Sequence, residues 1–139
     1  MSAEDLKAKV RRIHEEGVNK GNMAVFDELY AANDIFHHPN SPQENLEGLK
    51  AYFSAARTGY PDLHETIHDL MAAEGDKVVT RFTWEGTHTG EWPAGTPPSG
   101  KHVRMTLIGI TRFSGGKIVD AEGFRVASAS AISGGKSAI

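Results

Sequence analysis

Residues 84–124, WEGTHTGEWPAGTPPSGKHVRMTLIGITRFSGGKIVDAEGF, contain the pattern that decides the fold. Apolar and polar residues alternate on both sides of a Gly/Pro-rich connection, and the alternation resumes after Ser114-Gly115-Gly116. A period of two is typical of half-buried strands, and a short Gly-rich segment between two such runs predicts a hairpin. We therefore expect antiparallel strands within residues 77–90, 101–113 and 117–126.

The first half of the chain has a helical period instead, with apolar residues recurring every three to four positions. Three side chains of the N-capping type, Ser2, Asn22 and Asn45, precede these runs. The expected helices cover residues 2–21, 22–30 and 45–58. A short extended segment at residues 35–39 is expected between the second and third helices. Helices followed by hairpins predict an α+β fold in which a curved sheet wraps around the helices.

Length and composition suit one domain, expected at residues 1–126, with a flexible tail at 127–139. The chain has 39% apolar and 24% charged residues and a net charge of −3 with both signs interspersed, which argues against nucleic-acid or anionic-membrane partners. It contains no cysteine, so disulfide and thiolate chemistry are excluded. No apolar run approaches the roughly 18 residues of a membrane span, and we expect a cytoplasmic protein.

Two carboxylates are the first candidates for chemistry. Asp120 and Glu122 lie two residues apart, and the strand period predicts that they share a face with Ile118 and Phe124. Ionised groups on an apolar face are costly to bury unless they are paired, so such positions are often functional. The alternative is a structural ion pair with a strand arginine.

The chain resembles the SnoaL-like polyketide (ester) cyclases of the nuclear-transport-factor-two-like superfamily. The motifs that carry the resemblance are PDL at 61–63, GTHTGE at 86–91, PPSGK at 97–101 and RF-GGKI at 112–118, and the segment at 20–39 fits the family's opening. The resemblance implies a cone-shaped α+β barrel, in which a curved antiparallel sheet wraps around three N-terminal helices. It also implies an apolar cavity, a homodimer, and the absence of metal and organic cofactors.

The resemblance also implies a chemistry: ring closure of a small apolar or polyketide-like molecule by intramolecular aldol condensation, with a last-strand carboxylate as general acid and base. Asp120 and Glu122 occupy that neighbourhood, and we expect Glu122 to be the functional one. Counted from Gly116-Lys117-Ile118, the position of the family's catalytic aspartate holds Gly123, and that of its partner histidine falls near Gly109.

Histidines are the next candidates, because imidazole moves protons near neutral pH. His37 could orient a carbonyl or shuttle a proton, with His38 beside it at the cavity, where the family often places a histidine. His88 is expected either to line the cavity or to brace the Gly/Pro loop. The remaining expected wall residues, which could equally be plain core, are Tyr52, Phe53, Phe82, Trp84, Met105, Leu107 and Phe124.

Other functions stay open, and so does the question whether the protein is an enzyme. The scaffold could serve as a non-catalytic small-molecule binder, an epoxide hydrolase or a ketosteroid-isomerase-like enzyme. A remote alternative is a zinc hydrolase, because HETIH at 64–68 matches a zinc motif if it is helical. The local pattern of residues 62–74 fits a helix, whereas the family resemblance assigns a strand, on which His64 and His68 could not share a metal ion.

Overall fold

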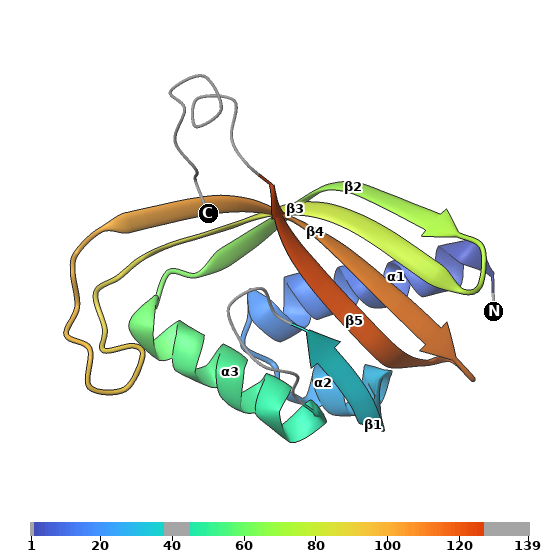
Figure 1. Cartoon of the computed structure of the whole chain (residues 1–139), viewed down its shortest axis with the longest axis horizontal. Coiled ribbons are helices and arrows are strands. Elements are labelled where there is room, and N and C mark those ends of the chain that lie inside the picture. Colours follow the sequence, from blue (N-terminus) through green and yellow to red (C-terminus); the bar gives the residue numbers. More distant parts are fainter. Residues whose placement is uncertain (1, 38–44, 127–139) are drawn as a thin grey trace.

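The computed structural model describes residues 2–37 and 45–126 (Figure 1). The elements, in chain order, are α1 (Ala3–Arg12), the π-helical turn η1 (Ile13–Val18), α2 (Ala24–Leu29), β1 (Tyr30–His37), α3 (Leu46–Gly59), β2 (His64–Ala73), β3 (Lys77–Thr87), β4 (His102–Ser114) and β5 (Lys117–Val126). His38 and residues 127–139, for which we expected a site histidine and a tail, lie outside the described residues.

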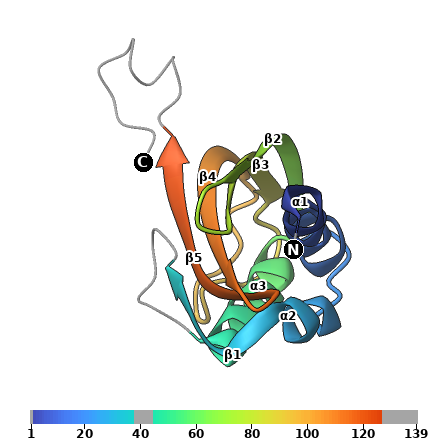
Figure 2. The ribbon, with the colours of Figure 1, turned by 90° about the vertical axis from the view of Figure 1, so that its right-hand side faces the viewer.

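The five strands form one curved sheet in the order β1-β5-β4-β3-β2. Figure 2 shows the sheet bending around the helices, which lie on its inner side. The predicted α+β architecture is therefore confirmed, although the described sheet remains open. The expectation of a purely antiparallel sheet is wrong for β1, which pairs with β5 in parallel. A parallel pair needs a long crossover, and the whole segment from α3 to β4 supplies it.

The helix starts follow from short polar side chains. Ser2 and Asp5 form a capping box, in which the Asp5 N–H donates to Ser2 Oγ at 3.1 Å. Asn45 Oδ1 accepts a hydrogen bond from the Gly48 N–H at 3.0 Å, so the predicted cap of α3 is confirmed. Helix α2 begins one residue later than Asn22 predicts, with Met23 at the cap position.

The segment that the local pattern left open is a strand. Residues 64–73 form β2, which pairs antiparallel with β3, so that Glu65 lies opposite Trp84. Strand pairing satisfies the backbone groups of this segment and outweighs its helical apolar spacing. The assignment implied by the family resemblance is thus confirmed.

A β-bulge in β5 changes which of its residues face the helices. Phe113 of β4 pairs with Ile118, but the preceding Arg112 pairs with Asp120, so Val119 has no partner across the ladder. One extra residue reverses the side-chain alternation beyond it. Ala121, only 7% exposed, therefore follows Ile118 on the inner face.

The predicted alignment of Asp120, Glu122 and Phe124 with Ile118 is consequently wrong beyond the bulge. Glu122 pairs with Ile110, which is exposed, and Phe124 is itself 46% exposed. The alternation that we read from the sequence assumed an unbroken strand, and the bulge depends on pairing with β4, which alternation does not reveal.

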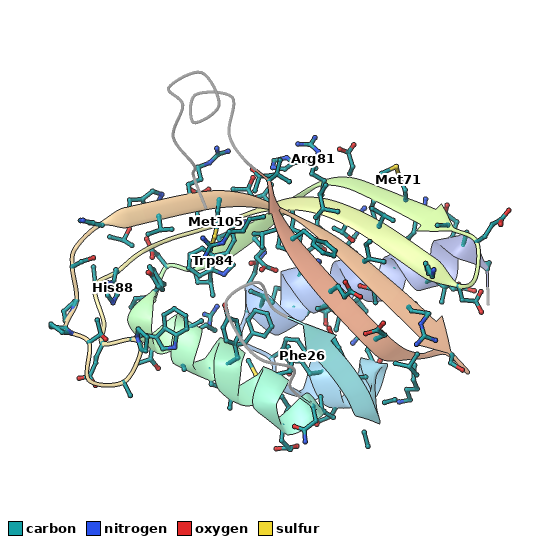
Figure 3. The ribbon with its side chains drawn as sticks, in the orientation of Figure 1. Phe26, Met71, Arg81, Trp84, His88 and Met105 are labelled. Atoms are coloured by element: carbon teal, nitrogen blue, oxygen red, sulfur yellow. The ribbon has the colours of Figure 1, made fainter. Side chains whose placement is uncertain are left out.

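The core lies between the inner face of the sheet and the helices. Phe26 is fully buried, and its ring lies 5.5 Å from that of Phe53 and 5.9 Å from that of Tyr30, measured between centroids. Figure 3 shows Phe26 on the helix side of the sheet, whereas Arg81 and Met71 project from the outer side. The two faces of the sheet thus have different environments.

Replacing Phe26 with alanine should lower the free energy of unfolding by about 3–5 kcal/mol, because it leaves a cavity among packed rings. The matched variant Phe124→Ala should lower the free energy of unfolding of the single folded chain by about 1 kcal/mol or less, because that side chain is half exposed there. Denaturant titrations at two protein concentrations would separate folding from subunit association. Equal losses for the two variants at both concentrations would contradict the inner and outer assignment.

Candidate functional site

A hollow with a volume of about 80 Å³ lies between the inner face of the sheet and the helices. Its wall is mostly apolar and draws on α1, η1, α3 and all five strands. The lining residues are Val10, Ile13, His14, Val18, Tyr30, Tyr52, Phe53, Glu65, Thr80, Phe82, Trp84, Met105, Leu107, Gly109, Thr111, Ile118, Ala121, Glu122 and Gly123. An apolar hollow with a few polar groups is the usual form of a small-molecule site.

Two glycines explain why space remains there. Gly109 of β4 and Gly123 of β5 are register partners, and Thr80 of β3 pairs with Gly109 on its other side. A Cβ atom built on Gly109 would lie 3.6 Å from Phe82 and 3.7 Å from the backbone oxygen of Glu122, which are ordinary contacts. Gly109 therefore leaves room that a small side chain could fill without a clash.

A buried histidine–carboxylate pair is the most distinctive polar feature of the hollow. His14 Nδ1 lies 2.6 Å from Glu65 Oε1, and the two residues are 9% and 5% exposed. When the carboxylate is ionised and the imidazole neutral, Nδ1 carries the proton that Glu65 accepts, and Nε2 has the free lone pair. No described residue hydrogen-bonds to that Nε2.

The local backbone holds this pair in place. His14 belongs to the π-helical turn η1, in which the Asn19 N–H donates to the His14 carbonyl at 3.0 Å. Such turns often occur at functional sites. The His14 ring also contacts Phe82, with centroids 4.5 Å apart. Gly17 permits close packing, because a Cβ there would lie 3.0 Å from the Phe26 ring.

Asn19 fixes the carboxylate partner. Its side-chain amide donates to the Glu65 carbonyl at 2.8 Å and accepts from the Glu65 N–H at 2.6 Å. Arg57 in turn donates to the carbonyls of Val18 and Asn19 at 2.6 and 3.2 Å. The side chain of Asn19 thus makes the two hydrogen bonds to the Glu65 backbone that a neighbouring strand would otherwise make, and these bonds hold Glu65 in position.

The sequence analysis missed this pair, although both members carry a signal. His14 follows Val10 by four positions and so lies on the apolar side of the first helix. Glu65 alternates with Leu63 and Ile67, so it is a carboxylate at an apolar-face position of a strand. The argument that we applied to Asp120 and Glu122 applies equally to Glu65.

The structure brings most of the expected wall residues together. Those that line the hollow are Tyr52, Phe53, Phe82, Trp84, Met105, Leu107 and Glu122. Asp120 lies opposite the exposed Arg112 in the strand register and is not among the lining residues. No described residue forms an ion pair with Glu122. His37 lies beside Glu122 by backbone register between β1 and β5.

His88 occupies the second of its two expected positions. Its Nδ1 lies 3.0 Å from Ser99 Oγ and accepts from the Ser99 N–H at 3.3 Å, and its ring stacks on Tyr60 at 5.1 Å. Figure 3 places His88 at the loop end of the molecule, apart from Trp84 and Met105. His88 thus braces the Gly/Pro loop and is not among the residues that line the hollow. Phe124, which we also expected in the wall, is half exposed and does not line the hollow either.

A second histidine–carboxylate pair lies outside the hollow. His102 Nε2 is 3.0 Å from Glu85 Oε2, and its Nδ1 is 3.0 Å from Thr87 Oγ1. Thr87 donates its backbone N–H and its hydroxyl to Asp62, and these bonds lower the pKa of the Asp62 carboxyl. This exposed series of hydrogen bonds provides a histidine–carboxylate pair with which the buried His14–Glu65 pair can be compared.

The HETIH segment does not form the zinc site of its motif. On β2, His64 and His68 are separated by about 13 Å at the usual strand rise. Glu65 is bound to His14, and His68 Nε2 lies 2.6 Å from Thr83 Oγ1. Within residues 2–37 and 45–126, no three His, Asp or Glu side chains are grouped as metal ligands. In the same residues, no helix is long and apolar enough to cross a membrane.

Comparison with solved structures finds the same fold in several proteins. IdmH from Streptomyces antibioticus, a proposed polyketide cyclase, is 26% identical, with a TM-score of 0.73 over 86% of this chain and 91% of that one. A proposed polyketide cyclase from Acidithiobacillus ferrooxidans is also 26% identical, with a TM-score of 0.72 over 90% and 91% of the two chains. A proposed SnoaL-like polyketide cyclase from Jannaschia is 22% identical, with a TM-score of 0.78 over 98% and 94%.

Among proteins with curated descriptions, none matches this chain. The sequence profile of the SnoaL-like polyketide cyclases matches residues 8–125, which include every helix and strand except the ends of α1 and β5. With the fold, the inward-facing hollow and this match in agreement, the chain belongs to the SnoaL-like polyketide cyclase family.

Proposed function

We propose that this protein catalyses acid–base chemistry on a small, apolar, polyketide-like molecule, of the type that closes a ring by intramolecular aldol condensation or isomerises a ketone. The observation that carries the proposal is the buried His14–Glu65 pair in the wall of an apolar hollow. Membership of the cyclase family supports the substrate class.

In the proposed reaction, Nε2 of His14 removes a proton from the carbon next to a substrate carbonyl. The resulting enolate attacks a second carbonyl, a carbon–carbon bond forms, and the imidazolium returns its proton to the new alkoxide. Glu65 holds the ring in orientation and stabilises its positive charge while the enolate exists. Exclusion of water from the hollow strengthens both interactions.

Glu122 is the rival base, as the sequence analysis expected. It contributes to the lining of the hollow, and His37 is its backbone neighbour on β1. Its register position opposite the exposed Ile110 favours His14 and Glu65 over it.

A non-catalytic binding function is the second candidate. The observation that favours it is the presence of Gly109 and Gly123 at the positions where, by the family resemblance, the acting histidine and aspartate would lie. The same hollow would then hold a ligand without converting it.

We also propose that the protein is a homodimer that associates through the outer face of β4 and β5. Ile110, Phe124 and Val126 are 36%, 46% and 39% exposed on these two strands. Apolar side chains gathered on one exposed face are typical of association surfaces.

Exchange of the α-hydrogens of 2-tetralone in D₂O, followed by NMR, tests for the general base without knowledge of the natural substrate. The protein should accelerate the exchange, and His14→Gln or Glu65→Gln should lower the acceleration about 100-fold or more. The matched control Glu85→Gln, which alters the exposed pair with His102, should leave the exchange unchanged.

The same assay separates the alternatives. Loss of exchange in Glu122→Gln with full exchange in Glu65→Gln would transfer the role of base to Glu122. Binding of 2-tetralone without any acceleration of exchange would favour the non-catalytic binder.

Phe124→Glu should convert the dimer to a monomer, because it places a charge in the middle of the proposed apolar contact. Sedimentation velocity at micromolar concentration measures the change, with Met71→Glu on β2 as the control that keeps the dimer. A monomeric parent protein would refute the proposed interface.

A further inference from the structure

The buried hydroxyl of Thr80 has no hydrogen-bond partner among the described residues. The residue is 1% exposed, lies on β3 and lines the hollow. Most buried polar groups in folded proteins are paired, so each exception calls for an explanation.

Stability does not provide that explanation. A buried hydroxyl without a partner opposes folding, and valine has nearly the same shape without that cost. The neighbours of Thr80 across the sheet are Gly109 on β4 and Leu70 on β2, and neither has a side-chain acceptor. Gly123 lies next to Gly109 on β5. Thr80 lines the hollow together with the two glycines, so a ligand above them would lie beside this residue.

Thr80 and the proposed base share a neighbour, Phe82. Phe82 is the next inward-facing residue of β3, about 6.6 Å along the strand from Thr80. The ring of Phe82 contacts the ring of His14, with centroids 4.5 Å apart. Thr80 and His14 are thus both neighbours of Phe82 in the wall of the hollow, Thr80 along the strand and His14 through the ring contact.

We propose that Thr80 Oγ1 donates a hydrogen bond to the substrate's carbonyl oxygen, which becomes the enolate oxygen when His14 removes the α-proton. The substrate class is accordingly a compact cyclic or aryl ketone, whose ring lies over Gly109 and Gly123. The inference rests on the proposed function for the identity of the base, whereas the recognition of the carbonyl is testable by binding alone.

Calorimetry with two matched probes tests it. One probe is 2-tetralone, and the other is 2-methylenetetralin, which has a C=CH₂ group in place of C=O and cannot accept a hydrogen bond. The protein should bind the ketone about three- to tenfold more tightly than the hydrocarbon, as expected for one neutral hydrogen bond in a dry site.

Thr80→Val should abolish this preference and should bind the hydrocarbon at least as well as the parent protein does. The variant should melt at the same or a higher temperature, because a buried unpaired hydroxyl has been removed. Thr80→Ser keeps the donor and should keep the preference. Gly109→Ala, which adds only a methyl group at ordinary contact distances, should weaken the binding of both probes.

The outcomes distinguish this inference from the proposed function. If both probes bind equally to the parent protein, or if Thr80→Val retains the preference, the role of Thr80 is wrong and the cavity function stands. If neither probe binds, both proposals fail. A lower melting temperature of Thr80→Val would mean that the hydroxyl serves the fold, which also overturns the inference.

Discussion

The β-bulge at Val119, which has no partner on β4, determines which residues of β5 line the hollow. Because β5 has one residue more than β4 at this point, Ala121 and Gly123 follow Ile118 on the inner face. Glu122 lies at the alternate register position, although it too borders the hollow. Small residues on the inner face leave a hollow where larger ones would complete the core. The space and its apolar character therefore follow from one local irregularity of strand pairing.

The polar chemistry of the hollow comes from the opposite side. His14 reaches it from a π-helical turn, and Glu65 comes from β2, which is an edge strand of the described sheet. Burial of such a pair is costly unless its geometry is held, and Asn19 and Arg57 hold it through backbone groups. The geometry of the pair is thus held at the junction between the first helix and the sheet.

Much of the fold could be predicted because local patterns encode it. The period of two in β3 to β5, the caps at Ser2 and Asn45, and the family motifs each point to the observed elements. The bulge at Val119 could not be predicted, because alternation within β5 shows nothing of its register with β4. The pair of His14 and Glu65 was missed for a similar reason: its members are separated by 51 positions and meet only when β2 packs against the helix.

The facing glycines have a consequence for how new activities could arise on this scaffold. A Cβ atom on Gly109 meets only ordinary contacts, so the position accepts a side chain without rebuilding the sheet. A single substitution there could therefore add an acid, a base or a bulky group to the hollow that His14 also lines. The inner wall combines the held His14–Glu65 pair with a position that tolerates substitution, so selection could change the chemistry of the hollow while the framework that folds the chain stays the same.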